Sequence, residues 1–283
     1  MGASFLLASF VGFNLLGGIS FQLKGIILSS FIMLIFGVID DLRELSILAK
    51  FTAQIIATGI LIFFGVKTQI MSIGALSNII ITFIWIIGIT NALNHLDVMD
   101  GLAAGIALIV NFSFLAIMSL NGEINLLILP LALGGAIASF FIFNLIPKKI
   151  YMGNSGSHFL GFVLAVIALV ISYAPLERKI ALFSPLLILG FPILDTGFLI
   201  LVRAYKKKIP FKKSNDHLAL RFLALGYSKK KSLAVMLAWS LFFSISGVII
   251  SQVSNSLGLI IIVCVGVAGL ILTIKMSKVA IDG

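Results

Sequence analysis

Charged residues are scarce in this chain of 283 residues: they make up 11% of it, whereas hydrophobic residues make up 60%. Soluble domains contain about 25% charged residues, so the composition excludes an ordinary soluble protein. The only cysteine, Cys264, lies inside an apolar run, which excludes a disulfide framework and a cysteine-based metal site. The first apolar stretch has no basic leader, so we expect no cleavable signal peptide.

Long apolar runs are abundant instead, and the mean hydropathy is +1.22. Runs of roughly 18 or more residues can cross a hydrocarbon core of about 30 Å as helices. They are continuous rather than alternating, which disfavours a β-barrel. The sequence therefore predicts an all-α, polytopic membrane helical bundle in a single integral-membrane domain, 1–283. About ten transmembrane helices are expected, at roughly 3–21, 25–39, 47–66, 72–90, 101–119, 125–146, 156–174, 181–202, 231–251 and 256–274.

The net charge of +10 is distributed unevenly between the two membrane faces that these spans define. One face carries 4 of the 20 basic residues, Lys24, Lys67, Arg178 and Lys179. The other face carries the remaining 16, namely Arg43, Lys50, Lys148, Lys149, Arg203, Lys206, Lys207, Lys208, Lys212, Lys213, Arg221, Lys229, Lys230, Lys231, Lys275 and Lys278. The positive-inside rule makes the second face cytoplasmic, with both termini on it. The pattern predicts a multi-pass protein of the plasma (inner) membrane and argues against a nucleic-acid partner.

Polar motifs concentrate on the predicted cytoplasmic face. In "FGVIDDLRELS", Asp40 and Asp41 stand where the second span ends. Adjacent carboxylates repel each other unless a cation or a hydrogen-bond donor compensates them. Mg²⁺ is one such cation, because it is usually held by one or two carboxylates together with substrate phosphates. The alternative reading is a solvated helix end.

The segment "NALNHLDVMDGLAAG" places Asn91, Asn94, Asp97 and Asp100 at three-residue intervals. On a regular helix these positions would drift around the axis, so a 3₁₀ turn or a loop is needed to align them. Gly101 permits the tight backbone geometry that such a turn requires. Carboxamides and carboxylates suit a nucleobase, a ribose or a metal. A solvated connection is disfavoured, because the segment contains no lysine or arginine.

Two further cytoplasmic segments carry weaker signals. In "YMGNSGSHFLGF", the backbone N–H groups around Gly153 and Asn154 could favour an anion at a helix start, whereas His158 is more often a packed residue than a ligand. The basic loop 203–217 could hold anionic lipid headgroups or a pyrophosphate, or could serve membrane topology alone.

Together these motifs resemble the polyprenyl-phosphate N-acetylhexosamine-1-phosphate transferases, glycosyltransferase family 4, over essentially the whole chain. The matching segments are the Asp40–Asp41 pair, "KFTAQ" with Lys50 and Gln54, "NALNHLDVMDGLAAG", "MGNSGSHFLG", "FPILDT" with Asp195, and "PFKKSNDHLALRFLALGYS". The resemblance favours the branch that uses UDP-N-acetylglucosamine-like donors over the branch that makes the peptidoglycan precursor.

The resemblance implies a Mg²⁺-dependent enzyme that transfers a sugar-1-phosphate from a UDP-N-acetylhexosamine to undecaprenyl phosphate in the bilayer and releases UMP. It assigns catalysis to Asp40, Asp41, Asp97 and Asp100, and the metal to Asp40, Asp41 and Asn154. It assigns substrate binding to Lys50, Asn91, Asn94, His217 and Arg221. The product would initiate a cell-wall or surface polysaccharide, and homodimerisation is left open.

The chain also departs from the family pattern. Asn154 replaces an aspartate that would be a metal ligand, and Ala219 and Leu220 replace paired histidines. The family's N-terminal helix and first cytoplasmic motif are expected to be missing from this sequence, whose match to the family begins at Gly2, either because they lie upstream of it or because they are absent. These departures motivate an alternative, a non-catalytic relative that binds lipid phosphate or nucleotide-sugar as a regulator or scaffold. A transporter is disfavoured, because the polar groups gather at one surface instead of lining a path.

Overall fold

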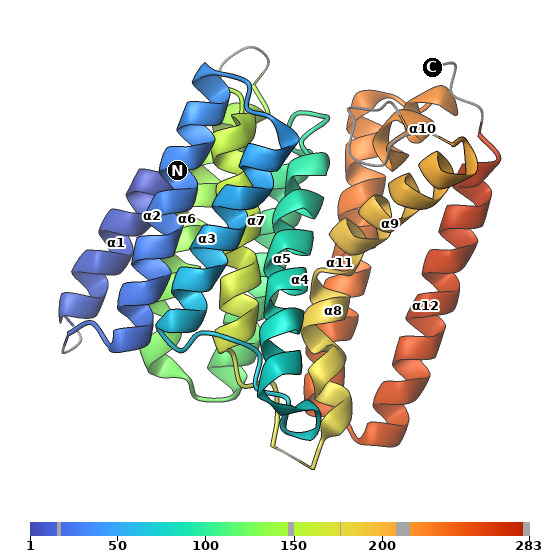
Figure 1. Cartoon of the computed structure of the whole chain (residues 1–283). Helices are drawn as coiled ribbons and strands as arrows, with labels where there is room; N and C mark the ends of the chain where they lie inside the picture. The colour runs from blue at the N-terminus through green and yellow to red at the C-terminus, as the bar shows by residue number, and fades with distance from the viewer. Residues whose placement is uncertain (16–17, 147–149, 176, 208–215, 280–283) are drawn as a thin grey trace.

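The computed structural model describes residues 1–15, 18–146, 150–175, 177–207 and 216–279 (Figure 1). Within these ranges the regular structure is entirely helical, which confirms the predicted class. The α-helices are α1 Gly2–Leu15, α2 Phe21–Leu42, α3 Ile47–Phe63, α4 Gly74–His95, α5 Leu102–Leu120, α6 Ile128–Asn144, α7 Gly153–Val170, α8 Ser184–Ile188, α9 Gly190–Tyr205, α10 Leu218–Ala224, α11 Lys229–Gln252 and α12 Asn255–Ser277. Three short 3₁₀ helices are η1 Met71–Ile73, η2 Ile124–Leu126 and η3 Lys179–Phe183.

Seven helical segments of the described chain are long and apolar enough to cross a membrane. They are α2, η1 with α4, α5, η2 with α6, α7, α11 and α12. An eighth span is formed if the bent pair Lys179–Ile188 and Gly190–Tyr205 is counted as one. The apolar helices α1 and α3 are shorter, at 14 and 17 residues. These ten segments correspond one by one to the predicted spans, so the polytopic bundle is confirmed and the number ten is approximate.

The predicted continuous span 181–202 is broken between α8 and α9, which meet at 69°. Pro192 follows directly after the break and has no N–H group to bond the carbonyl of Ile188. That carbonyl accepts a hydrogen bond from Ser244 Oγ of α11 instead, at 3.0 Å. The neighbouring helix therefore satisfies the backbone group that the proline leaves without a partner, and the bend is stable inside the bundle.

Helix α7 packs mainly against α2 and α4, and two glycines allow this close approach. A Cβ atom at Gly37 of α2 would lie 2.4 Å from the Cα atom of Ser155. A Cβ atom at Gly161 of α7 would lie 2.7 Å from the Cα atom of Thr90 in α4. Because α7 runs antiparallel to α2 and α4, its first residues lie beside the last residues of both helices, at the upper end of Figure 1. This end carries the predicted polar motifs.

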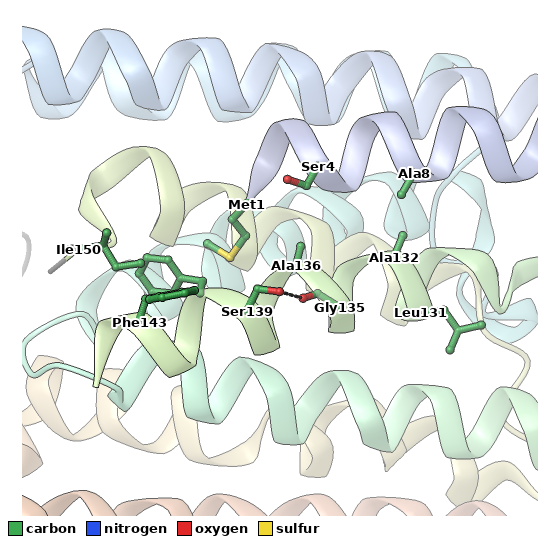
Figure 2. A pocket seen from close by; sticks show the side chains of 11 residues that line it. Met1, Ser4, Ala8, Leu131, Ala132, Gly135, Ala136, Ser139, Phe143 and Ile150 are labelled. Carbon is green, nitrogen blue, oxygen red and sulfur yellow. Dashed lines mark hydrogen bonds between the residues drawn. The ribbon is translucent and has the colours of Figure 1, made fainter. Parts of the chain in front are cut away.

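A groove of about 500 Å³ lies between α1 and α6, and Figure 2 shows it from close by. Small side chains such as Ala8, Ala132 and Ala136 line it, and none of its lining side chains is charged. Ser139 donates a hydrogen bond to the carbonyl of Gly135 within α6, so its hydroxyl is satisfied locally. None of the predicted site residues lines this groove.

Five of the basic residues that were counted on the predicted cytoplasmic face lie outside the described residues, Lys148, Lys149, Lys208, Lys212 and Lys213. The other eleven are described, and they lie at or beside the ends of α2, α9, α11 and α12, on α10 and in the first turn of α3. These elements meet at the same end of the bundle as the polar motifs.

Candidate active site

The candidate active site lies where α2 and α4 end and α7 begins. Asp40 and Asp41 are in the last turn of α2, and Asn91 and Asn94 are near the end of α4. Asp97 and Asp100 follow in the turn between α4 and α5, and Asn154 is the second residue of α7. The fold thus gathers residues from three motifs that are up to 113 positions apart, as the Asp41–Asn154 contact shows.

Asp41 caps the start of α7. Its Oδ1 and Oδ2 atoms accept hydrogen bonds from the backbone N–H groups of Asn154 at 2.7 Å and Ser155 at 3.0 Å. Gly153 adopts φ +66°, and a Cβ atom there would lie 2.8 Å from Asp41 Oδ2. The prediction that this helix start favours an anion is therefore confirmed, and the anion is a carboxylate of the protein itself.

Asp40 has different surroundings from Asp41. Its side chain is buried and its Oδ2 atom lies 2.7 Å from Lys50 Nζ of α3. Its Oδ1 atom accepts a hydrogen bond from the Leu45 N–H at 2.9 Å. The mutual repulsion of the two adjacent carboxylates is thus offset by separate partners, a lysine for Asp40 and a helix start for Asp41.

The carboxamides of α4 connect it to its two neighbours. Asn91 Nδ2 donates to Gln54 Oε1 of α3 at 2.8 Å, and Gln54 Nε2 donates back to Asn91 Oδ1 at 3.4 Å. Asn94 Nδ2 donates to Asn154 Oδ1 at 3.2 Å and to Ser157 Oγ at 2.9 Å, both in α7. Asn94 and Asn154 therefore meet, as expected for one site. The sequence analysis placed Ser157 only among the residues whose backbone N–H groups start this helix, and it missed the contact of the Ser157 hydroxyl with Asn94.

The turn after α4 has the tight geometry that the spacing predicted, but it begins later. Helix α4 continues to His95, five residues past the predicted end at 90, so Asn91 and Asn94 are helical. The Asp97 N–H then bonds the Asn94 carbonyl, three residues back, at 3.3 Å. Gly101 adopts φ +80°, and its N–H donates to Asn144 Oδ1 of α6 at 2.6 Å. No sequence signal pointed to Asn144.

Negative charge accumulates at this site. Partial desolvation by the surrounding chain, together with the nearby charges of Asp100 and Asp41, raises the pKa of Asp97 from 3.8 to about 6. Asp97 and Asp100 are exposed, so a ligand can reach them. A cluster that disfavours its own ionisation is suited to a positively charged ligand.

The donor set at the start of α7 fits a hard divalent cation. Carboxylate oxygens of Asp41 and the carboxamide oxygen of Asn154 are the ligand type that Mg²⁺ prefers. Within the described ranges, no group of three or more His, Cys, Asp or Glu side chains could hold a metal ion. In the usual Mg²⁺ arrangement, the protein supplies only one or two carboxylates and substrate phosphates complete the shell.

A second polar group, the C-terminal cluster, consists of Asp195, Asp216, His217 and Arg221. Asp195 of α9 is fully buried, lies 3.2 Å from His217 Nδ1, and accepts the Leu218 N–H at 3.0 Å. Arg221 of α10 is 2% exposed, and its Nη1 atom donates to the carbonyls of Met276 and Val279, each at 2.7 Å. The ring of His217 lies 6.3 Å from that of His95, so this cluster borders the candidate active site.

The predicted substrate-binding residues thus fall into two groups. Lys50, Asn91 and Asn94 lie at the candidate active site with Asn154 and the carboxylates. His217 and Arg221 are buried beside it, with protein partners for the atoms described above. A role of these two residues in substrate binding stays a prediction.

The chain is similar to known proteins over most of its length. The family described as Glycosyl transferase family 4 matches residues 23–172. A probable undecaprenyl-phosphate N-acetylglucosaminyl 1-phosphate transferase of Bacillus subtilis (strain 168) is 33% identical over 253 residues, 85% of this chain and 69% of the relative. An undecaprenyl-phosphate alpha-N-acetylglucosaminyl 1-phosphate transferase of Thermotoga maritima is 30% identical over 82% of this chain and 72% of the relative.

A third relative is a decaprenyl-phosphate N-acetylglucosaminephosphotransferase of Mycolicibacterium smegmatis, 28% identical over 77% of this chain. The chain spans 60% of the length of that relative. The names of all three relatives pair a polyprenyl phosphate with the transfer of an N-acetylglucosamine phosphate group.

Proposed function

Because the chain belongs to glycosyl transferase family 4, we propose that it transfers N-acetylhexosamine-1-phosphate from a UDP-sugar to undecaprenyl phosphate and releases UMP. One observation carries this proposal. Asp41 and Asn94 contact the start of α7, and Asp97 lies close enough for the charge of Asp41 to affect it, all at one end of a membrane bundle. The names of the relatives support the transferase, and none of them supports the non-catalytic alternative.

The reaction joins two anionic partners. An oxygen of the lipid phosphate forms a bond to the sugar-linked phosphorus, and the bond from that phosphorus to the bridging oxygen breaks, so UMP leaves with the electron pair. A phosphate monoester loses its second proton with a pKa of about 6, so the attacking oxygen is mostly ionised at neutral pH. Catalysis then depends mainly on positioning and on charge neutralisation.

The residues take distinct roles in this proposal. Asp97 is exposed beside Asp41 and accepts any proton that the lipid phosphate still carries. Asn94 and Asp100 position the nucleotide. Asp40 orients the Lys50 ammonium through their 2.7 Å ion pair, and Lys50 neutralises a phosphate. Asp40 is therefore a positioning residue here, not the metal ligand that the resemblance assigned.

We propose Mg²⁺ as the cofactor, held by Asp41 and Asn154. A bound Mg²⁺ would supply positive charge that offsets the repulsion of the two anionic phosphates. The hydrogen bond from Asn94 Nδ2 to Asn154 Oδ1 turns the amide of Asn154 so that its oxygen faces α4. The second lone pair of that oxygen remains available to a cation.

The membrane setting is proposed as follows. The protein is multi-pass, as its apolar helices and its membrane-enzyme relatives indicate. We place the active site on the cytoplasmic side of the plasma (inner) membrane, because most of the basic residues lie at the same end of the bundle. A UDP-sugar is a soluble cytoplasmic donor, which agrees with that orientation.

The test uses purified protein in detergent with undecaprenyl phosphate, UDP-N-acetylglucosamine and Mg²⁺, and follows UMP release with and without a chelator. We expect UMP only when both substrates and Mg²⁺ are present. UMP that forms without the lipid phosphate would instead indicate hydrolysis of the donor. No UMP from a panel of UDP-sugars, with UDP-sugar binding retained, would refute the transferase and favour the non-catalytic alternative.

A further inference from the structure

A second cavity, the distal cavity, lies at the end of the bundle opposite the candidate active site, the lower end in Figure 1. Its volume is about 470 Å³, within the range of roughly 300–1,000 Å³ that is usual for ligand sites. Helix α2 starts at this cavity, which Gln22 and Leu23 line, and ends at Asp40 and Asp41. Its 22 residues span about 33 Å, so the cavity faces the opposite membrane surface.

Positive charge gathers in the distal cavity. Of the four basic residues that the sequence assigns to this membrane face, Lys67, Arg178 and Lys179 line the cavity, and Lys24 does not. None of the described residues that line it is acidic. The positive-inside rule disfavours cations on this face. Three of them, from segments more than 100 positions apart, nevertheless meet in one cavity, which indicates an anionic ligand.

The cavity also has apolar walls. Leu23, Ile26, Val66 and Ile171 form its buried base, and Leu182, which also lines it, is 53% exposed. A cavity with cations and apolar walls, at the surface of a membrane-spanning bundle, suits an amphiphile with an anionic headgroup. A soluble anion would leave those walls in contact with water.

Two segments carry the basic residues of the cavity, the loop with Lys67 and the segment with Arg178 and Lys179. Hydrogen bonds to residues that do not line the cavity fix both of them in place. On the side of Lys67, Asn78 of α4 accepts from the Ile70 N–H at 2.8 Å and donates to the Ile70 carbonyl at 3.0 Å. The Thr68 N–H donates to Thr82 Oγ1 at 3.0 Å. The loop that carries Lys67 is therefore fixed to α4, and little further ordering is needed when a ligand binds.

The other side is fixed to the turn between α11 and α12. Arg178 Nη1 donates to the Ser251 carbonyl at 2.8 Å. Asn255 accepts from the Ile180 N–H at 3.1 Å and donates to the Glu177 carbonyl at 2.9 Å. The backbone that presents Arg178 and Lys179 is thus positioned independently of the loop that carries Lys67.

We propose that the distal cavity binds the phosphate headgroup of an anionic glycerophospholipid from the membrane leaflet opposite the active site. Lys67 and Lys179 attract the phosphate from the two sides of the cavity, and the apolar walls receive the upper part of the acyl chains. The bound lipid links the α3–α4 loop to the segment before α8 and stabilises the bundle. This proposal requires only that the bundle spans a membrane, and it does not depend on the transferase reaction.

The experiment compares the full chain in nanodiscs of phosphatidylcholine alone with nanodiscs that also contain phosphatidylglycerol. We expect phosphatidylglycerol to raise the melting temperature of the wild type and to remain bound in native mass spectrometry. Lys67→Gln and Lys179→Gln should each weaken its retention about fivefold, as expected for one lysine near an anionic surface. Lys24→Gln is the matched control, because it removes the same charge from the same face outside the cavity.

Each other result would overturn the proposal. Equal loss of lipid from Lys24→Gln would show that only the overall surface charge matters. Equal melting temperatures in the two lipids, with no retained phosphatidylglycerol, would exclude a site. Equal stabilisation by inorganic phosphate or glycerol phosphate in phosphatidylcholine nanodiscs would show a soluble-anion site. If one of the two cavity variants does not fold, lipid retention by the other, compared with Lys24→Gln, still decides the matter.

Discussion

The two polar groups at the upper end of the bundle differ in how their charges are compensated. In the C-terminal cluster, Asp195 faces His217 and a backbone N–H, and Arg221 donates to two carbonyls. In the candidate active site, Asp97 and Asp100 lie near Asp41, and partial desolvation together with these charges raises the pKa of Asp97, although its side chain is exposed. Charged groups that are paired with other protein groups stabilise the fold. Carboxylates that repel one another favour the binding of a positively charged ligand, which compensates their charge.

The two groups are also neighbours, since the rings of His95 and His217 are 6.3 Å apart. The C-terminal cluster therefore lies next to the candidate active site and packs against it through His217 and His95. Arg221 holds the end of α12 against α10 through the Met276 and Val279 carbonyls. From this difference we expect substitutions in the candidate active site to change the rate and substitutions in the C-terminal cluster to change stability.

The largest effect is expected from Asp97→Asn. The substitution keeps the shape of the side chain and removes its charge, so UMP release should fall by about 10²–10³-fold. The melting temperature should stay the same or rise, because a repulsion with Asp100 and Asp41 is removed. Both are measured on the same preparation. A rate within threefold of wild type would contradict the role given to Asp97.

The next largest effect is expected from Gly153→Ala. Its φ of +66° is unfavourable for alanine, and the new Cβ atom would lie 2.8 Å from Asp41 Oδ2. The Asp41 carboxylate must then shift from the start of α7, and such a displacement can cost about 100-fold in rate. Gly135→Ala is the control, because a Cβ atom there meets nothing within 4 Å. Equal rates of the two variants would show that the Asp41 contact is not needed.

Arg221→Met tests the C-terminal cluster. The variant leaves the Met276 and Val279 carbonyls without their charged donor, while Asp216 keeps its 2.7 Å contact with Lys206. We expect a loss of about 2–4 kcal/mol in unfolding free energy, from hydrogen bonds to a buried charged group. The KM for the UDP-sugar should stay within about threefold at low temperature. A large increase in KM with unchanged stability would instead make Arg221 a substrate-binding residue.

A pH titration of stability without substrate or metal separates the two groups further. The folded pKa of Asp97 is about 6, above its model-compound value of 3.8. Protonated Asp97 therefore favours the folded state below about pH 4, and this contribution is lost as the pH rises through 6. Because Asp97 is exposed, solvent screening limits the change to about 1 kcal/mol. The difference between wild type and Asp97→Asn measures it, and a flat difference would contradict the raised pKa.

The sequence predicts the bundle and the members of the site better than it predicts their contacts. Continuous apolar runs and the distribution of basic residues indicate the class and the end that carries the site, since both depend on the bilayer alone. The Asp41–Asn154 contact joins residues 113 positions apart, and the spacing within either motif contains no information about it. Pro192 is a local signal for the break at Leu189, but Ser244 of α11, which satisfies the Ile188 carbonyl, lies 56 positions away and no local pattern identifies it.

The smallest effect is expected from Asn91→Ala, which tests a residue that the resemblance assigned to the substrate. Asn91 Nδ2 already donates to Gln54 Oε1 and to the Ile87 carbonyl, both at 2.8 Å. Its loss leaves buried Gln54 without that partner, so stability should fall by about 1 kcal/mol. Replacing Gln54 as well should cost less than the sum of the two single changes, because the two amides depend on each other.

The KM for the UDP-sugar should be unchanged in Asn91→Ala, since the amide of Asn91 joins α3 to α4, whereas Asn94, one turn later, contacts α7 at the active site. A tenfold increase in KM for Asn91→Ala, with the stability of the wild type, would place Asn91 among the residues that contact the nucleotide.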